Sequence, residues 1–168
     1  MAIISREQIV EGLVDILGKD QVVTDEQVLK ESSIDRYRKY EQVCEVYTQP
    51  IPAAVVYVKS AEEVSEVLKF ANDNEINVVP RTGHSAIEGG LETALKDSVV
   101  IDGSTMNKVI KVDEYNMQVT CQCGVPLQEL DDMLRERGLT TGHPPQSKPL
   151  AQMGGLVATR SIGQFSTL

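Results

Sequence analysis

The segment from Pro80 to Gly90 has the residue types and spacing that most clearly suggest chemistry. It reads Pro-Arg-Thr-Gly-His-Ser-Ala-Ile-Glu-Gly-Gly and follows a short apolar run that is typical of a strand. A diphosphate is bound by several converging backbone N–H groups, which requires small residues and tolerance of positive φ. The segment matches neither the G-x-G-x-x-G fingerprint nor the Walker A loop. It therefore suggests another kind of phosphate loop, with an ordinary glycine-rich connection as the alternative.

Two later segments could contribute to the same kind of site. Asp102-Gly-Ser-Thr-Met-Asn107 follows another apolar run, and alone it is typical of a turn. The stretch from Gly142 to Gly163 combines glycines, prolines and hydroxylated side chains and has no acidic residue. Such a stretch packs a core poorly, but its backbone can lie against a flat ligand.

The elements that would position these segments begin with a strand–helix–strand unit. Residues 53–58 are a β-branched run after a proline, and residues 60–71 combine a Ser60–Glu63 capping box with apolar residues at helical spacing. With a second strand at 78–80, the unit predicts parallel strands and a right-handed crossover. Further elements are predicted as a strand at 98–102, a hairpin of strands at 109–112 and 117–121, and a helix at 125–137.

Residues 1–49 are predicted to form a helical extension ahead of a ligand-binding domain at 50–168. Ser5 with Gln8 is a capping box that predicts a helix over 5–17, and Thr24 with Gln27 predicts a short helix near 25–32. The polar residues 31–49 lack a clean period and are expected to be irregular.

Composition excludes some functions. A net charge of −9 argues against nucleic acid as a partner. No apolar run approaches the ~18 residues of a membrane span. Three cysteines without a secretory signal favour reduced thiols and a cytoplasmic location. Cys121 and Cys123 are better explained as small strand side chains than as metal ligands, so no metal site is expected.

Together, the three segments resemble the FAD-binding domain of the vanillyl-alcohol oxidase type, over about residues 50–168. Within that type the chain most resembles the D-2-hydroxyacid dehydrogenases, which include D-lactate dehydrogenase and the glycolate oxidase D-subunit, and alkyldihydroxyacetonephosphate synthase. The matching positions are Pro80, Gly83, Ser85, Gly89 and Gly90, then Asp102, Ser104, Met106 and Asn107, then Gly138-Leu139, Pro145-Gln146-Ser147, Gly154-Gly155 and residues 158–163. Thr82 and His84 stand where the family usually has glycine.

The resemblance implies an α+β fold with two lobes that hold FAD between them. One lobe is a small parallel βαβ lobe, and the other is a mixed or antiparallel lobe that this chain is expected to leave incomplete at its C-terminus. The first loop would hold the pyrophosphate, and the later segments would line the ribityl and isoalloxazine parts. The cofactor-binding residues that the resemblance implies are Pro80, Arg81, Thr82, Gly83, His84, Ser85, Ala86, Gln146, Ser147, Gln152, Gly154, Gly155, Thr159, Arg160, Ser161 and Ile162.

Two histidines need separate consideration. Some relatives attach FAD covalently through a histidine in the first loop, but alignment on Arg81 and Glu88-Gly89 places Ser85, not His84, at that position. Noncovalent FAD is therefore expected. His143 is expected to be a contact on the ribityl side or within its loop, with a catalytic base as the alternative.

The resemblance implies a flavin-dependent oxidoreductase that oxidises a D-2-hydroxyacid, lactate-like or glycolate-like, by hydride transfer to FAD. Electrons would pass to an electron-transfer flavoprotein, a quinone or oxygen, and the catalytic residues are expected beyond Leu168. One alternative is a flavoenzyme like alkyldihydroxyacetonephosphate synthase, which Thr141-Gly-His143 and Thr159-Arg160 favour. The other is a truncated domain without activity of its own, and homo-oligomerisation is left open.

Overall fold

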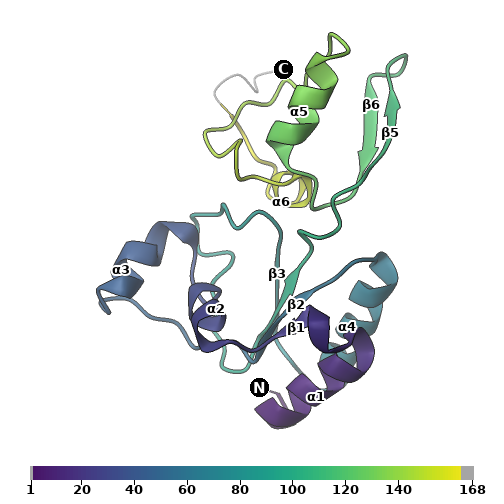
Figure 1. The fold of residues 1–168 in the computed structure, drawn as a ribbon. Coiled ribbons are helices and arrows are strands. Elements are labelled where there is room, and N and C mark those ends of the chain that lie inside the picture. The colour runs from purple at the N-terminus through teal and green to yellow at the C-terminus, as the bar shows by residue number, and fades with distance from the viewer. Residues whose placement is uncertain (1, 164–168) are drawn as a thin grey trace. The chain divides into compact units, whose positions relative to one another are not determined.

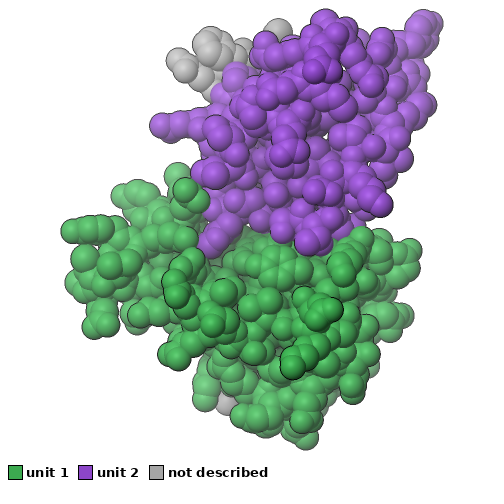
Figure 2. All heavy atoms as spheres, in the orientation of Figure 1, with its two compact units in different colours: residues 1–81, 86–103 green, residues 82–85, 104–168 purple. Residues whose placement is uncertain are grey.

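The computed structural model describes residues 2–163, whose helices and strands are drawn in Figure 1. The chain divides into two compact units, coloured separately in Figure 2. The first unit contains the residues up to 81 together with 86–103, and the second contains 82–85 together with the residues from 104 onward.

The first unit is built on a four-stranded sheet in the order β1-β2-β4-β3. Its strands are β1 (Val22–Val23), β2 (Ala54–Tyr57), β3 (Val78–Arg81) and β4 (Val99–Asp102). β4 pairs in parallel with both β2 and β3, so the predicted parallel strand–helix–strand unit is confirmed, with β4 lying between its two strands. β1 adds an antiparallel edge to β2, which the sequence did not predict. Val55 and Val100 on the two central strands are fully buried, as expected when helices cover a parallel sheet.

The first unit contains four α-helices and two short 3-10 helices among its described residues. They are α1 (Arg6–Leu17), η1 (Lys19–Gln21), α2 (Glu26–Glu31), η2 (Arg36–Arg38), α3 (Lys39–Val43) and α4 (Ala61–Asp73). The Ser5 capping box of α1 is confirmed. Gly12 of α1 leaves room for the ring of Phe70 on α4, where an added Cβ would lie 2.6 Å from Phe70 Cε2.

Three local predictions in this unit were wrong. The cap of α2 is Asp25, whose carboxylate accepts from Val28 N, rather than Thr24, because Asp is a stronger N-cap than Thr. Ser60 caps α4, but the Glu63 carboxylate accepts from Lys59 N instead of closing a capping box on Ser60. Residues 31–49 are not irregular throughout, since they contain η2 and α3.

The second unit packs a hairpin against a helix. β5 (Val109–Asp113) and β6 (Gln118–Cys121) form the predicted antiparallel pair. α5 (Leu127–Arg135) begins after Pro126, which is its N-cap and not part of its first turn. Leu130 and Leu134 of α5 lie in a buried cluster with Val125, against which Val112 and Val119 of the hairpin pack.

A short helix, α6 (Met153–Ala158), lies in the glycine-rich stretch from Gly142 to Gly163 and was not among the elements predicted from the sequence. Adjacent glycines disfavour a helix, but Gly154 is required there by close packing against Cys123. None of the helices in the described part of the chain is long and apolar enough to cross a membrane.

Candidate functional site

Within the second unit, residues 82–85 lie against the main chain of residues 150–152. A Cβ on Gly83 would overlap the carbonyl oxygen of Leu150 and would lie 3.0 Å from the amide nitrogen of Gln152. Neither main-chain atom can move aside as a flexible side chain would. The structure therefore brings the first predicted loop and the third predicted segment together, and only glycine fits at their contact.

The start of α6 continues this arrangement. A Cβ on Gly155 would lie 3.4 Å from Thr82 Oγ1. On Gly154, an added Cβ would lie only 2.6 Å from the Cβ of Cys123, and the Gly154 amide donates to the Cys123 carbonyl at 2.7 Å. Gly154 thus lets the start of α6 pack tightly on the turn that follows β6, and a side chain on Gly155 would be in contact with Thr82.

Gln152 immediately precedes α6 and carries a buried acceptor. Its backbone forms a bridge with Pro126, which fixes its position at the start of the helix. The side-chain oxygen Oε1 is buried and accepts no hydrogen bond from any residue that the structure describes. A buried polar atom without a partner costs free energy. A ligand with an N–H or O–H group directed at this oxygen would remove that cost.

The far end of α6 turns back onto the segment after α5. The amides of Arg160 and Ser161 donate to Val157 and Leu156 at 3.2 and 2.9 Å, which is the Schellman pattern, with Arg160 at a φ of 50°. Ser161 Oγ lies 3.2 Å from His143 Nε2. The predicted residues 159–162 are therefore held beside the loop that carries His143.

Pro80, Arg81 and Ala86 belong to the first unit. The Arg81 guanidinium is nearly buried and donates from Nε to Asp102 Oδ2 at 2.7 Å and from Nη1 to Ser32 Oγ at 2.8 Å. Asp102, the first residue of the second predicted segment, is therefore a structural partner of Arg81. The cofactor role of Arg81 stays a prediction. In the structure its guanidinium contacts Asp102 and Ser32.

Sequence reasoning missed the residue that holds the end of the first loop. Asp35 is 1% exposed, and its carboxylate accepts from the amides of Gly89 and Leu91. Thr93 adds a contact from its hydroxyl to the carbonyl of Pro50 at 2.6 Å. No local pattern around Asp35 signals this role, because its partners lie more than fifty positions away in the chain.

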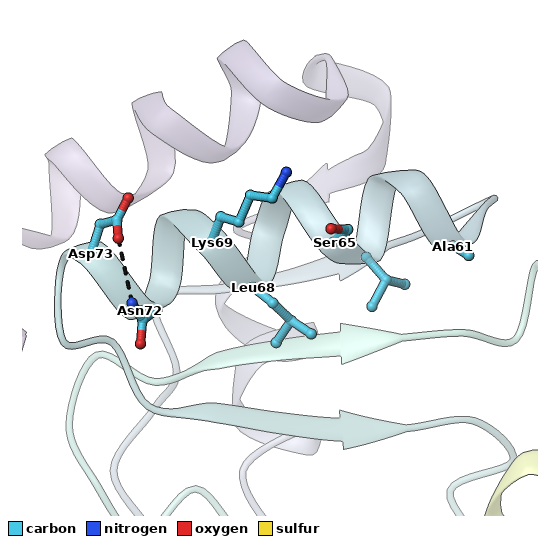
Figure 3. Close-up of a pocket in the computed structure, with 7 residues that line it drawn as sticks. Ala61, Ser65, Leu68, Lys69, Asn72 and Asp73 are labelled. Carbon is cyan, nitrogen blue, oxygen red and sulfur yellow. Dashed lines mark hydrogen bonds between the residues drawn. The ribbon is translucent and has the colours of Figure 1, made fainter.

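A separate hollow runs along the outer face of α4 and carries none of the predicted residues (Figure 3). It is lined by Ala61, Val64, Ser65, Leu68, Lys69, Asn72 and Asp73. All of these belong to one helix, and the hydrogen bond drawn there joins the neighbouring side chains of Asn72 and Asp73. A hollow formed by one helix face has no convergent polar groups from several elements, so it is not the candidate site.

Comparison with known proteins decides the family. A family model described as an FAD binding domain matches residues 52–168. The chain belongs to this family. FAD is therefore the cofactor for which its site is built, and the predicted α+β FAD-binding fold is confirmed.

The relatives are oxidoreductases of greater length. The chain is 64% identical over 165 residues to the uncharacterized FAD-linked oxidoreductase YgcU of Escherichia coli (strain K12). The matched region covers 98% of this chain and 34% of that protein. It is 38% identical over 114 residues to the mitochondrial D-lactate dehydrogenase [cytochrome] 1 of Saccharomyces cerevisiae, covering 67% of this chain and 19% of the relative. The chain thus spans about a third of the length of its E. coli relative.

Among solved structures, the chain is similar to an alkyldihydroxyacetonephosphate synthase. The TM-score is 0.84 at 27% identity, and the likeness covers 99% of this chain and 35% of the synthase. The segments around Gly83, Gln152 and Gly155 fit a flavin nucleotide. Glycine lets these segments pack closely on one another, and the buried acceptor Gln152 Oε1 would be satisfied by an N–H or O–H group of the cofactor.

Proposed function

We propose that this chain is the FAD-binding part of an enzyme that oxidises a D-2-hydroxyacid, lactate-like or glycolate-like. The observation that carries the proposal is the close approach of Gly83 to residues 150–152, which joins two of the segments that resemble D-2-hydroxyacid dehydrogenases. The similarity to a yeast D-lactate dehydrogenase supports the substrate class.

In this proposal the backbone of residues 80–86 holds the FAD pyrophosphate, with the hydroxyls of Thr82 and Ser85 as further donors. Residues 146–152 and 159–162 line the ribityl and isoalloxazine parts, and Gln152 Oε1 accepts a hydrogen bond from the cofactor. When bound, FAD would supply the acceptor for the hydride of the substrate. In this proposal the residues of this chain bind and orient the cofactor.

We also propose that FAD is bound noncovalently. His84 has a φ of 47°, a left-handed backbone conformation that glycine adopts more readily. This conformation suits a backbone contact in a turn of the loop, and alignment places Ser85 at the position where relatives attach the cofactor. The electron acceptor is an electron-transfer flavoprotein, a quinone or oxygen, and the location is cytoplasmic.

The test uses the complete reading frame that contains this chain, purified and loaded with FAD under anaerobic conditions. D-lactate, glycolate and D-2-hydroxyglutarate are added separately, with L-lactate as the matched control. Bleaching of the visible flavin absorbance by a D-acid but not by L-lactate supports the proposal. A bound flavin that no D-2-hydroxyacid reduces overturns the substrate class.

One alternative rests on its own observation. The TM-score of 0.84 to alkyldihydroxyacetonephosphate synthase, together with Thr141-Gly-His143 and Thr159-Arg160, favours chemistry on a lipid-like phosphate substrate. If the loaded protein forms an alkyldihydroxyacetone phosphate and ignores every 2-hydroxyacid, the alternative replaces the main proposal.

A further inference from the structure

We infer that Asp131 is a positioning residue of the candidate FAD site, because its buried carboxylate holds both ends of the loop that carries Gln146 and Ser147. The inference rests on the proposed role of that loop in binding FAD. Asp131 lies on α5 between Leu130 and Asp132, and from the sequence alone it resembles an ordinary solvent-exposed helix residue. In the structure it is 1% exposed.

Each oxygen of the Asp131 carboxylate serves a different end of the loop. Oδ1 accepts from Thr140 Oγ1 at 2.7 Å and from the Thr141 amide at 3.0 Å, at the loop's beginning. Oδ2 accepts from Lys148 Nζ at 2.6 Å, at the loop's end. Arg135, one turn later on α5, donates to the same Oδ2 at 2.7 Å. A single carboxylate thus closes residues 140–148 into a fixed loop.

The anchor itself is rigid. Leu130 and Leu134 of α5 are buried in the core of the second unit, so the helix cannot shift without disturbing that core. The Lys148 ammonium is mostly buried, with 17% of its side chain exposed. A cation held this far from water depends on its anionic partner, so loss of the Asp131 charge would release Lys148 and the loop with it.

The fixed loop leads directly to the contact with Gly83. The Ser147 carbonyl accepts from the amides of Leu150 and Ala151 at 2.8 and 2.9 Å, which makes the turn that delivers Leu150. The Leu150 carbonyl is the atom that Gly83 packs against. A displacement at Lys148 would therefore reach the backbone surface proposed for the FAD pyrophosphate through two residues.

The test compares Asp131→Asn with Asp132→Asn in the complete reading frame. Asp132 is the adjacent exposed carboxylate on the same helix, and it accepts a hydrogen bond from the side-chain amide of Gln128 on the surface, so it is a matched control. Affinity for FAD is measured by titration of folded protein, and the visible circular dichroism of the bound flavin reports its surroundings. Urea unfolding of the FAD-free proteins reports stability separately.

Asp131→Asn is expected to weaken FAD binding by about tenfold or more. Losses of this size are typical when a residue that orients ligand-binding residues is removed. Its flavin dichroism should change as well, and Asp131→Glu, which keeps the charge, should restore part of the affinity. Asp132→Asn should change neither property. Wild-type affinity and dichroism in folded Asp131→Asn would overturn the inference while FAD binding itself stands. Failure of the wild-type protein to bind FAD would instead refute the proposed function.

Should Asp131→Asn not fold, Lys148→Met decides the question. This variant keeps the buried carboxylate with Arg135, Thr140 and Thr141 and removes only the tie to the end of the loop. Weaker FAD binding and a changed flavin dichroism support the inference, and unchanged values overturn it.

Discussion

Gly83 and Leu150 approach so closely that the carbonyl oxygen of Leu150 fills the position that a Cβ on Gly83 would occupy. The contact joins a loop that follows a strand of the first unit to a segment that follows α5, although the two are far apart in the chain. A family resemblance explains why both segments are rich in glycine. The contact adds a physical reason for one of those glycines, which is the lack of room for any side chain.

Gly83→Ala is expected to weaken FAD binding strongly, because the loop must move away from residues 150–152 to make room. Overpacking of this kind costs about 1–3 kcal/mol of folding free energy as well. Gly90→Ala is the control, since a Cβ there meets nothing within 4 Å. FAD titration and urea unfolding measure the two effects, and equal affinities for the two variants would show that the contact does not shape the site.

His84→Gly is expected to stabilise the protein by up to about 1 kcal/mol, because glycine adopts a positive φ without the penalty that a side chain brings. It should also keep its flavin. Ser85→Gly, at a position without positive φ, should bring no such gain. Acid precipitation of the wild-type protein is expected to leave the flavin in the supernatant. A yellow pellet that turns colourless in His84→Gly would establish covalent attachment through this histidine.

Asp102→Asn is expected to lower the free energy of unfolding by about 3–5 kcal/mol, the cost of leaving a buried cation without its anion. Its partner Arg81 is only 8% exposed. The matched surface pair is Lys69 with Glu66, where both side chains are more than half exposed, so Glu66→Gln should have little effect. Chemical denaturation of the three proteins tests this, and a small effect of Asp102→Asn would mean that Arg81 finds another partner.

Asp131 should make stability depend on pH in acid. Burial alone would raise the pKa of its carboxyl, but the hydrogen bonds from Lys148, Thr140 and Arg135 outweigh burial and hold the pKa well below its usual range. A group whose pKa is lower in the folded state stabilises the fold above its unfolded pKa and loses that effect as pH falls toward the folded value. The stability advantage of wild type over Asp131→Asn should therefore be constant near neutral pH and shrink below about pH 4. An advantage that persists unchanged in strong acid would contradict this.

Local sequence patterns predicted the helices and strands that depend on neighbouring residues, such as capping residues, apolar periodicity and turns. The helix over 6–17 follows from Ser5 and its apolar period, and the hairpin follows from two β-branched runs around a polar turn. The position of β4 between β2 and β3 was not predicted, because strand order depends on pairing between distant segments.

The features that the sequence did not reveal depend on distant contacts. α6 contains adjacent glycines that argue against a helix, and its packing against Cys123 overrides that tendency. Asp35 and Asp131 resemble surface acids in short polar stretches, and only the fold shows that both are buried anchors of loops. The glycine-rich loops themselves could be recognised, since their residue types and order resemble those of a known family.

A crystal structure of the complete protein with FAD would show where the cofactor lies relative to the loop at residues 82–86. We expect the pyrophosphate to lie within hydrogen-bonding distance of main-chain amides in residues 82–86. We also expect a donor group of the cofactor to reach Gln152 Oε1, the acceptor that is buried without a partner among the described residues. FAD bound without contact to residues 82–86, with Gln152 Oε1 still unsatisfied, would contradict the assignment of the site.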